Sequence, residues 1–381
     1  MTEVEDRSWR MLPSEQALWT GGPTPGVPRD LHWTVASGLF FTLALIMALF
    51  AGLLYVASIP AVRSTAFTAF YCLLTGVAIH LLPRYALDPC RFRITNRQVI
   101  WRRGPQRRTI ERAAITYARI HWHRSAPGVG HLELVRAVPF GPLARKQRIM
   151  LHDVVGPDRL LALIRGAEPS EFAGYADVKL TDRLDRNERV IWGGSPVGMS
   201  LGRGEMLTGG VGLIVLIAGV IYAYRTGGIL VSLEELGLPV RSGTWAMLFS
   251  AIVVSCAIIL AVGAFLLWKG TWGARADGSR TEYLLTDSRL IIRRGRKELS
   301  VERRRIVDVA DLPASGGSHN LHLILDAPNA RALEDSGALS LFAPPRATVP
   351  PVLFEVADGE QLRKLILDRP SGSVPPVDRA A

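Results

Sequence analysis

The sequence predicts a membrane protein of the α+β class. Four transmembrane helices are expected to form two hairpins, and each hairpin is followed by a small antiparallel β domain closed by a C-terminal helix. The chain of 381 residues carries an internal repeat that covers most of its length. Four apolar runs approach or exceed the roughly 20 residues that a membrane-spanning helix needs. The arginine-rich segments after each pair of runs contain short apolar and alternating stretches bounded by turn residues, which are typical of strands.

The repeat is plainest between residues 92–115 and residues 283–306. Both segments read as an aromatic residue, a threonine, an apolar run, Arg-Arg-Gly, a basic turn and Glu-Arg. One constant offset aligns four identical pairs: Thr95 with Thr286, Gly104 with Gly295, Glu111 with Glu302, and Ile115 with Ile306. A repeat of this kind indicates that the chain is built from two like units.

A second, shorter block of the repeat precedes each pair of apolar runs. The strings EQALWTGGP and ERVIWGGSP share four residue types at equal spacing. The matched residues are Glu15, Trp19, Gly21 and Pro23 in the first block and Glu188, Trp192, Gly194 and Pro196 in the second. The offset between these blocks is smaller, so the second unit contains an insertion, which we expect in the loop between its two helices.

The apolar runs are candidates for membrane spans. They are Trp33–Ala57, Thr65–Leu82, Met206–Tyr224 and Trp245–Trp268. Tryptophan and tyrosine lie at their ends, where the interfacial belts of membrane proteins are found. Buried core helices of a soluble protein are the alternative, but four such runs in a chain with a positive mean hydropathy favour a membrane.

The distribution of arginine predicts the orientation of these spans. The loop at 58–64 contains one arginine, and the loop at 225–244 contains two arginines against two glutamates. The stretch 83–203 and the segment after residue 269 are rich in arginine. By the positive-inside rule, both termini and the middle segment are expected in the cytoplasm. The N-terminal segment lacks the features of a cleaved signal peptide, so we expect none to be removed.

These features divide the chain into seven parts. Each β domain is expected to end in one helix, near residues 156–164 and 359–367, whose apolar residues share a face. The parts are 1–32 with the first motif block, 33–83 as the first hairpin, 84–168 as the first β domain, 169–205 as a linker with the second motif block, 206–268 as the second hairpin, 269–369 as the second β domain, and 370–381 as a disordered tail.

The order of these features resembles a known family. The E-x-x-L/I-W-x-G-x-P motif, the two-helix hairpin and the F/Y-x-I/L-T-x-x-R/Q-V/L-I strand are similar to those of the bacterial pleckstrin-homology domain membrane proteins. The resemblance covers nearly all of the chain as two tandem copies. It implies a bent antiparallel sheet closed by a C-terminal helix, a location in the bacterial inner membrane, and contact with lipid or protein at the membrane face.

The excess of basic residues predicts an anionic partner. A net charge of +11 fits an acidic membrane face or nucleic acid, but no aromatic stacking platform supports nucleic acid. Each basic residue near an anionic leaflet contributes about 1 kcal/mol, so we expect the basic clusters to contact lipid headgroups or protein partners. Their alternative role is to fix topology and solvate strand faces. The clusters are Arg91, Arg93, Arg102, Arg103, Arg107 and Arg108 in the first unit and Arg293, Arg294, Arg296, Lys297, Arg303 and Arg304 in the second.

No catalytic, cofactor or metal site is predicted. The three cysteines cannot build a disulfide framework or a four-ligand zinc site. His121 and His123 share a strand face, but the sequence shows no third group that would complete a metal site. His80, near the inner end of its span, is the one candidate for an intramembrane ionisable group, which disfavours a transporter. We therefore expect a non-enzymatic membrane scaffold without a cofactor. A membrane-bound enzyme or enzyme subunit is the alternative, and homo-oligomerisation stays open.

Overall fold

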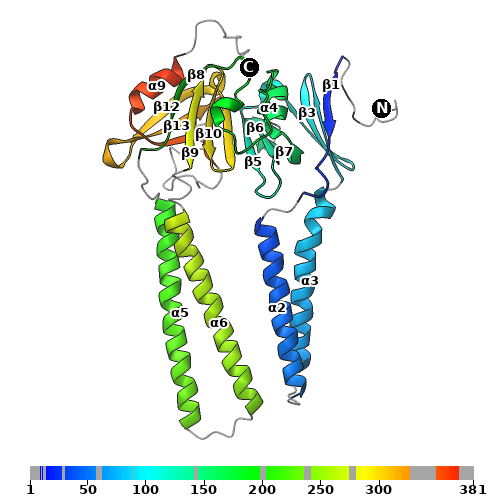
Figure 1. Cartoon of the computed structure of the whole chain (residues 1–381), viewed down its shortest axis with the longest axis vertical. Coiled ribbons are helices and arrows are strands. Elements are labelled where there is room, and N and C mark those ends of the chain that lie inside the picture. Colours follow the sequence, from blue (N-terminus) through cyan, green and yellow to red (C-terminus); the bar gives the residue numbers. More distant parts are fainter. Residues whose placement is uncertain are drawn as a thin grey trace.

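The computed structural model describes residues 9, 11, 14–27, 31–56, 62–87, 89–140, 145–197, 203–235, 242–273, 280–326 and 349–368. The α+β class predicted from the sequence is confirmed. Antiparallel strands form three sheets, and two pairs of long helices extend from the same side of the β structure (Figure 1). The predicted disordered tail at 370–381 lies outside the described residues.

The long helices pack in two pairs. The pairs are α2 (Leu31–Val56) with α3 (Val62–Leu87), and α5 (Arg203–Glu235) with α6 (Ser242–Trp268). Three stretches are long and apolar enough to cross a membrane: Ala36–Val56, Thr65–Leu82 and Met206–Gly228. Within the described residues, the apolar stretch that includes the end of α6 is shorter, Ile258–Gly273. Three of the four predicted spans therefore have the length and composition of membrane helices.

Glycines let α5 and α6 approach closely. A Cβ atom on Gly212 would overlap the backbone of Leu267, and one on Gly263 would lie 2.9 Å from the backbone nitrogen of Leu216. Close contact at small residues is how helices commonly associate in membranes. The glycines of these apolar runs therefore have a packing role between the two helices.

The first unit contains seven strands and one closing helix. β1 (Ala17–Gly21), β2 (Cys90–Thr95), β3 (Gln98–Arg103) and β4 (Gln106–Glu111) form a four-stranded sheet in that order. A short 3-10 turn, η1 (Arg112–Ala114), leads to β5 (Tyr117–Trp122), β6 (Val129–Phe140) and β7 (Arg145–Val155), and α4 (Pro157–Arg165) closes the unit. β1 belongs to the sheet although the motif block lies before the first hairpin.

The second unit repeats this plan. β8 (Val190–Gly194), β9 (Thr281–Thr286), β10 (Arg289–Arg294) and β11 (Lys297–Glu302) pair in that order. The turn η4 (Arg303–Arg305) precedes a separate three-stranded sheet of β12 (Ile306–Pro313), β13 (His319–Leu325) and β14 (Val352–Val356), and α9 (Gly359–Leu367) closes the unit. The predicted order of strands and closing helix is therefore present in both units.

The two units share one sheet, which the sequence left open. β5 of the first unit pairs antiparallel with β11 of the second, with Tyr117 opposite Val301 and His121 opposite Lys297. The result is a seven-stranded sheet in the order β7-β6-β5-β11-β10-β9-β8. Backbone pairing across the boundary makes the units one continuous β structure, seen side by side above the helices in Figure 1.

Alternating apolar residues of the strands form a separate core in each unit. Phe92, Ile94 and Leu132 belong to the first core, and Leu285 and Leu321 to the second, and all five are fully buried. Every second residue of a strand points to the same face, so alternating strands bury one apolar face. The alternation of apolar residues in the sequence thus accounts for the buried face of each strand. The two separate cores explain why each half of the chain forms its own unit.

The described part of the linker packs between the units. Its short helix η2 (Leu180–Arg183) buries Leu180, and Leu184 follows in the same cluster. Both leucines belong to one buried cluster with Leu284 and Ile291 of the second unit. Arg183 of the linker also lies 3.2 Å from Asp158 of α4, so the linker contacts both units.

Candidate functional site

The first motif block is held by its glutamate. The Thr95 hydroxyl donates to Glu15 Oε1 at 2.5 Å, and the side-chain amide of Gln98 donates to Oε2 at 3.1 Å. The backbone N–H of Gln98 donates in turn to the Thr95 hydroxyl oxygen at 2.9 Å, which closes the turn between β2 and β3. Glu15 is buried, so these hydrogen bonds replace its hydration. The first motif block and the repeat segment that contains Thr95 therefore meet in space, a contact that the spacing alone did not predict.

The second block has the same arrangement with an added charge. Thr286 donates to Glu188 Oε1 at 2.6 Å, and Arg289, in the position of Gln98, donates to the two carboxylate oxygens at 2.8 Å each. Burial of Glu188 by itself raises its pKa. The hydrogen bonds and positive charge of Arg289, with the hydroxyls of Thr286 and Ser288, outweigh burial and lower the pKa of Glu188 to about 2.

The tryptophan and glycine of each block contact one another. Trp19 folds over Gly21, where a Cβ atom would overlap the indole ring, and Trp192 folds over Gly194 in the same way, with a Cβ position 2.7 Å from the ring. A register shift in β1 and in β8 accompanies both contacts. The W-x-G spacing is therefore explained by a steric requirement, because the indole ring occupies the space that a side chain two residues later would fill.

Another repeated arginine caps the closing helix. Arg112 donates to the carbonyl oxygens of Leu163 and Ile164 at the end of α4, at 2.9 and 2.6 Å. Arg303 likewise donates to the carbonyl of Leu365, at 2.7 Å, and to that of Asp368. The last carbonyls of a helix lack partners within the helix and carry partial negative charge. The Arg of each Glu-Arg pair therefore closes its unit.

The basic cluster of the first unit lies next to the helices. α3 ends at Leu87, β2 begins at Cys90, and Cys90 pairs with Arg103 across the sheet. The turn that carries Arg102, Arg103 and Arg107 is therefore at the sheet end nearest the first hairpin. The backbone φ of Gly104 is +55°, which only glycine adopts readily in this turn.

The burial of the first cluster is uneven. Arg91, Arg103 and Arg108 are exposed, whereas Arg102 and Arg107 are half-buried. Arg93 is fully buried, and its guanidinium lies 4.5 Å from the centre of the Trp9 ring. Arg93 therefore packs inside the first unit, and the other five remain at its surface.

The basic cluster of the second unit is largely engaged in the fold. Arg293 donates to the carbonyls of Ala176 and Val178 in the linker, at 2.5 and 2.9 Å, and Arg296 to the carbonyl of His123 at 2.6 Å. Arg294 and Arg303 are buried. Lys297 is half-buried, and Arg304 is exposed beside Glu302. Burial withholds Arg294 and Arg303 from any surface contact, so the two clusters have different environments despite their similar sequences.

A buried ion pair lies at the boundary between the two units, and neither of its residues is matched by the repeat. Arg183 of the linker donates to both carboxylate oxygens of Glu298 on β11, at 2.7 and 3.0 Å. The indole N–H of Trp122 on β5 donates to Glu298 Oε1 at 3.0 Å. Both side chains of the ion pair are at most 5% exposed. Because these residues lie far apart in sequence, only the folded chain brings them together.

A cleft of about 600 Å³ lies where the two units meet. It is lined by η1, α4 and the end of β11 with η4. Within it, Glu302 pairs with Arg304 at 2.5 Å and with Arg165 at 3.9 Å, and Arg165 pairs with Asp185 at 2.7 Å. Arg165 of the first unit therefore contacts Glu302 of the second unit and Asp185 of the linker.

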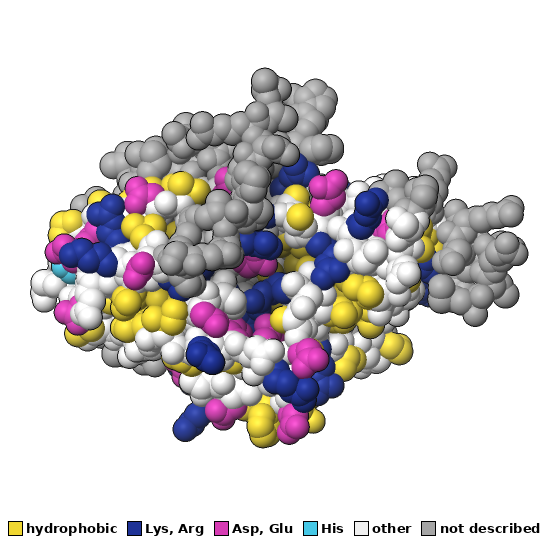
Figure 2. All heavy atoms as spheres, turned by 90° about the horizontal axis from the view of Figure 1, so that it is seen from above, with side chains coloured by type: hydrophobic (Ala, Val, Ile, Leu, Met, Phe, Trp, Pro, Cys, Tyr) yellow, Lys and Arg dark blue, Asp and Glu magenta, His cyan; other side chains and the backbone are white. Residues whose placement is uncertain are grey.

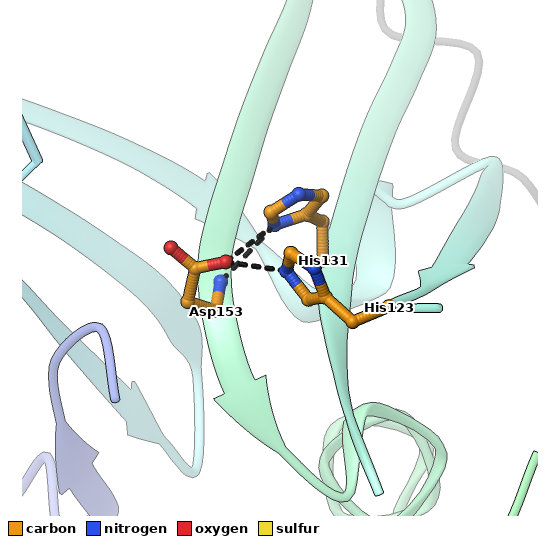
Figure 3. Close-up of side chains that lie close together, drawn as sticks. All are labelled: His123, His131 and Asp153. Carbon is orange, nitrogen blue, oxygen red and sulfur yellow. Dashed lines mark hydrogen bonds and ion pairs between the residues drawn. The ribbon is translucent and has the colours of Figure 1, made fainter. Parts of the chain in front are cut away.

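Two histidines and an aspartate meet at the edge of the first unit (Figure 3). His123 follows β5, His131 lies on β6, and Asp153 lies on β7. His123 Nε2 is 2.6 Å from Asp153 Oδ1, and His131 Nδ1 is 3.5 Å from the same oxygen. The backbone N–H of Asp153 donates to His131 Nδ1 at 3.1 Å. These are three potential metal ligands on three different strand segments.

The histidine pair considered in the sequence is divided between two places. His121 lies beside Glu133, with Nε2 3.9 Å from Oε2, and burial together with the positive charge of Lys297 lowers its pKa to about 4. His123 instead joins His131 and Asp153. Sequence spacing did not predict that His131 and Asp153 join His123, because loops separate the three residues and no short motif links them.

The face away from the helices carries both signs of charge. Figure 2 shows Lys and Arg side chains interspersed with Asp and Glu side chains on this face, with apolar side chains between them. No family model, curated protein or solved structure matches this chain. Its function is therefore argued from its own residues.

Proposed function

We propose that this protein is a non-enzymatic protein of the bacterial inner membrane that presents two pleckstrin-homology-like modules to the cytoplasmic leaflet. The four long helices would cross the membrane as two hairpins, with both termini in the cytoplasm. The extension of both helix pairs from one side of a joined β structure supports this topology. So does the arginine-poor sequence of the loops at 58–64 and 225–244, compared with the arginine-rich β units.

The architecture of each unit supports the pleckstrin-homology-like assignment. In each unit four strands pair antiparallel in order, the next three strands pair with one another, and a helix of nine residues closes the unit. The family resemblance implies a bent antiparallel sheet with a C-terminal helix, which is the same order of elements. The two units, joined through β5 and β11, would form one platform under the membrane.

The position of the turn at residues 102–107 carries the proposal. This turn adjoins the first residues after α3, so it would lie at the inner leaflet if α3 spans the membrane. Arg91, Arg103 and Arg108 are exposed there. Their attraction to an anionic leaflet would be worth about 3 kcal/mol together, at about 1 kcal/mol per basic residue. We therefore assign anionic lipid contact mainly to the first unit, and partner binding to the mixed-charge face away from the helices.

Hydrogen exchange of the full-length protein tests the lipid contact. The chain is reconstituted in nanodiscs of phosphatidylcholine or of phosphatidylglycerol, and exchange is followed over residues 98–110. We expect slower exchange of the turn in phosphatidylglycerol, because lipid phosphates would order its arginines. The triple variant Arg91→Ser, Arg103→Ser and Arg108→Ser removes the three exposed arginines and should lose that difference.

Arg304→Ser provides the matched control. Arg304 is exposed in the second unit. It follows the C-terminal end of β11, whereas the Gly295 turn precedes the N-terminal end of that strand. The control variant should leave the lipid-dependent protection unchanged. Equal exchange in the two lipids for the native protein, or full protection in the triple variant, would refute the lipid contact. A reporter fused at residue 370 that is active only outside the cytoplasm would refute the orientation.

A further inference from the structure

The first unit contains a bulge in which an acidic residue adopts a left-handed backbone. Asp153 has φ of +52°, which is uncommon for a residue other than glycine. The β6–β7 register shifts beside it, between the pairs Gly130–Val154 and Leu132–Leu151. Its carbonyl accepts a backbone hydrogen bond from Thr24 at 2.7 Å, which ties down the segment after the first motif block. Bulges of this kind redirect side chains and are common near functional sites.

The second unit repeats this bulge. Glu355 has φ of +54°, and its carbonyl accepts the N–H of Val197, at 2.9 Å, from the segment after the second motif block. The N–H of Glu355 donates to Asn320 Oδ1 at 2.9 Å, as the N–H of Asp153 donates to His131 Nδ1. The bulge is therefore a structural device of both units, and an asparagine at the His131 position is sufficient for it.

The two units differ in the side chains around the bulge. Ala314 occupies the position of His123, because both residues donate their N–H across the start of the same hairpin, to Ser318 and to Val129. The second unit thus has alanine and asparagine where the first has two imidazoles. Since the bulge forms without the imidazoles, anchoring of the chain does not explain why the first unit has them.

We propose that His123, His131 and Asp153 bind a divalent transition-metal ion of the zinc class. Two imidazole nitrogens and one carboxylate oxygen form a donor set that such ions prefer. The three ligand atoms lie within 4.8 Å of one another, and they come from three strand segments that the sheet already fixes (Figure 3). Little rearrangement is needed to surround an ion.

The contacts among the three residues show what the ion replaces. His123 Nε2 and Asp153 Oδ1 are hydrogen-bonded at 2.6 Å, and the ion takes the place of that hydrogen bond, with any displaced proton released to solvent. His131 Nδ1 accepts a hydrogen bond from the backbone N–H of Asp153. When Nδ1 binds the ion instead, that N–H takes another acceptor. The side chains of His131 and Asp153 are 14% and 18% exposed, so water can reach the site and supply a fourth ligand.

Metal titration of the full-length protein in mild detergent tests the site. After treatment with a chelator, the protein is titrated with Zn²⁺ against a chromophoric competitor, and Co²⁺ is added separately to record its visible absorption. We expect one ion per chain, with Co²⁺ bands typical of a four-coordinate nitrogen and oxygen site. X-ray absorption of the zinc-loaded protein should count two imidazoles.

The double variant His123→Ala, His131→Asn copies the second unit. It should keep the fold, because Ala314 and Asn320 support the same bulge there, and it should lose the bound ion. His121→Ala removes a neighbouring imidazole outside the group and should bind as the native protein does. Absence of stoichiometric binding, equal binding by the double variant, or loss on removal of His121 alone would overturn the proposal. If the double variant fails to fold, an imidazole count other than two in the native protein decides against it.

Discussion

At the residue scale, the repeated motifs are hydrogen-bonded pairs between distant segments. The Thr286 hydroxyl oxygen accepts the backbone N–H of Arg289, at 3.0 Å, and its hydrogen is donated to Glu188, at 2.6 Å, so one hydroxyl links two blocks of the repeat. A buried carboxylate must have partners, because burial removes its hydration. This pairing explains why the spacing within the blocks and their order are the same in both units. The pairing forms with Gln98 in one unit and with Arg289 in the other.

The variant Glu188→Gln should destabilise the second unit by about 3 kcal/mol, the low end of the range for breaking a buried ion pair. Buried Arg289 would lose its nearer carboxylate, at 2.8 Å, and keep the more distant one of Asp185, at 3.5 Å. Thermal unfolding of the full-length protein in detergent measures the loss. Glu168→Gln is the control, since its ion pair with Arg186 is exposed, with side chains 69% and 64% accessible. Exposed pairs contribute at most about 1 kcal/mol. A similar loss in both variants would contradict the prediction.

Acid should weaken the same contact. The pKa of Glu188 is lowered to about 2 in the folded protein, so its contribution to stability is complete above the usual glutamate pKa of about 4.3. That contribution is lost as the pH falls from there towards 2, because the unfolded chain takes up the proton first. Unfolding temperatures measured between pH 5 and pH 3 should converge for the native protein and Glu188→Gln. Parallel curves would show that Glu188 is not the group responsible.

At the element scale, the closing helix of each unit depends on one arginine. The side chain of Arg303 reaches the carbonyls of Leu365 and Asp368 and is itself buried. α9 has only nine residues, too few to be stable alone in water. Its stability therefore comes from packing of Leu362 and Ile366 on the core and from this cap.

The variant Arg303→Lys should loosen the end of α9, because an ammonium group cannot reproduce the forked donors of a guanidinium. We expect a loss of about 1–2 kcal/mol, the scale of a hydrogen bond between a charged donor and a carbonyl. Hydrogen exchange should increase in the last turn of α9. Arg304→Lys, at an exposed neighbouring position, should leave exchange there unchanged, and a larger effect from that control would argue against the cap.

At the scale of the whole molecule, β5 and β11 convert two units into one body. Their pairing is reinforced by the linker, whose Arg183 reaches Glu298 on β11. Glu298 also accepts from Trp122 on β5, so one carboxylate contacts the linker and both units. The contacts of this one carboxylate therefore hold the two β units and the linker together.

A double-mutant cycle tests this boundary. Arg183→Met should cost about 3–5 kcal/mol, because it leaves the buried carboxylate of Glu298 without a cation. Glu298→Met should cost less, because Arg183 keeps the carboxylate of Asp158 at 3.2 Å. The double variant should cost much less than their sum, since neither charge remains. Hydrogen exchange of β5 and β11 should increase in the single variants and recover in the double one. Additive effects would show that the two residues act independently.

The sequence by itself determined the repeat, the apolar helices, the presence of short strands in each unit and the closing helices. These features depend on local periodicity and on matched spacing, and both are properties of the linear sequence. Only the tertiary structure decided that Arg93, Arg294 and Arg303 are buried, although they read like their exposed neighbours. It also decided that the units share a sheet and that His123 meets His131 and Asp153. Those outcomes depend on which distant strands lie side by side, and contacts between distant strands leave no periodic trace in one sequence.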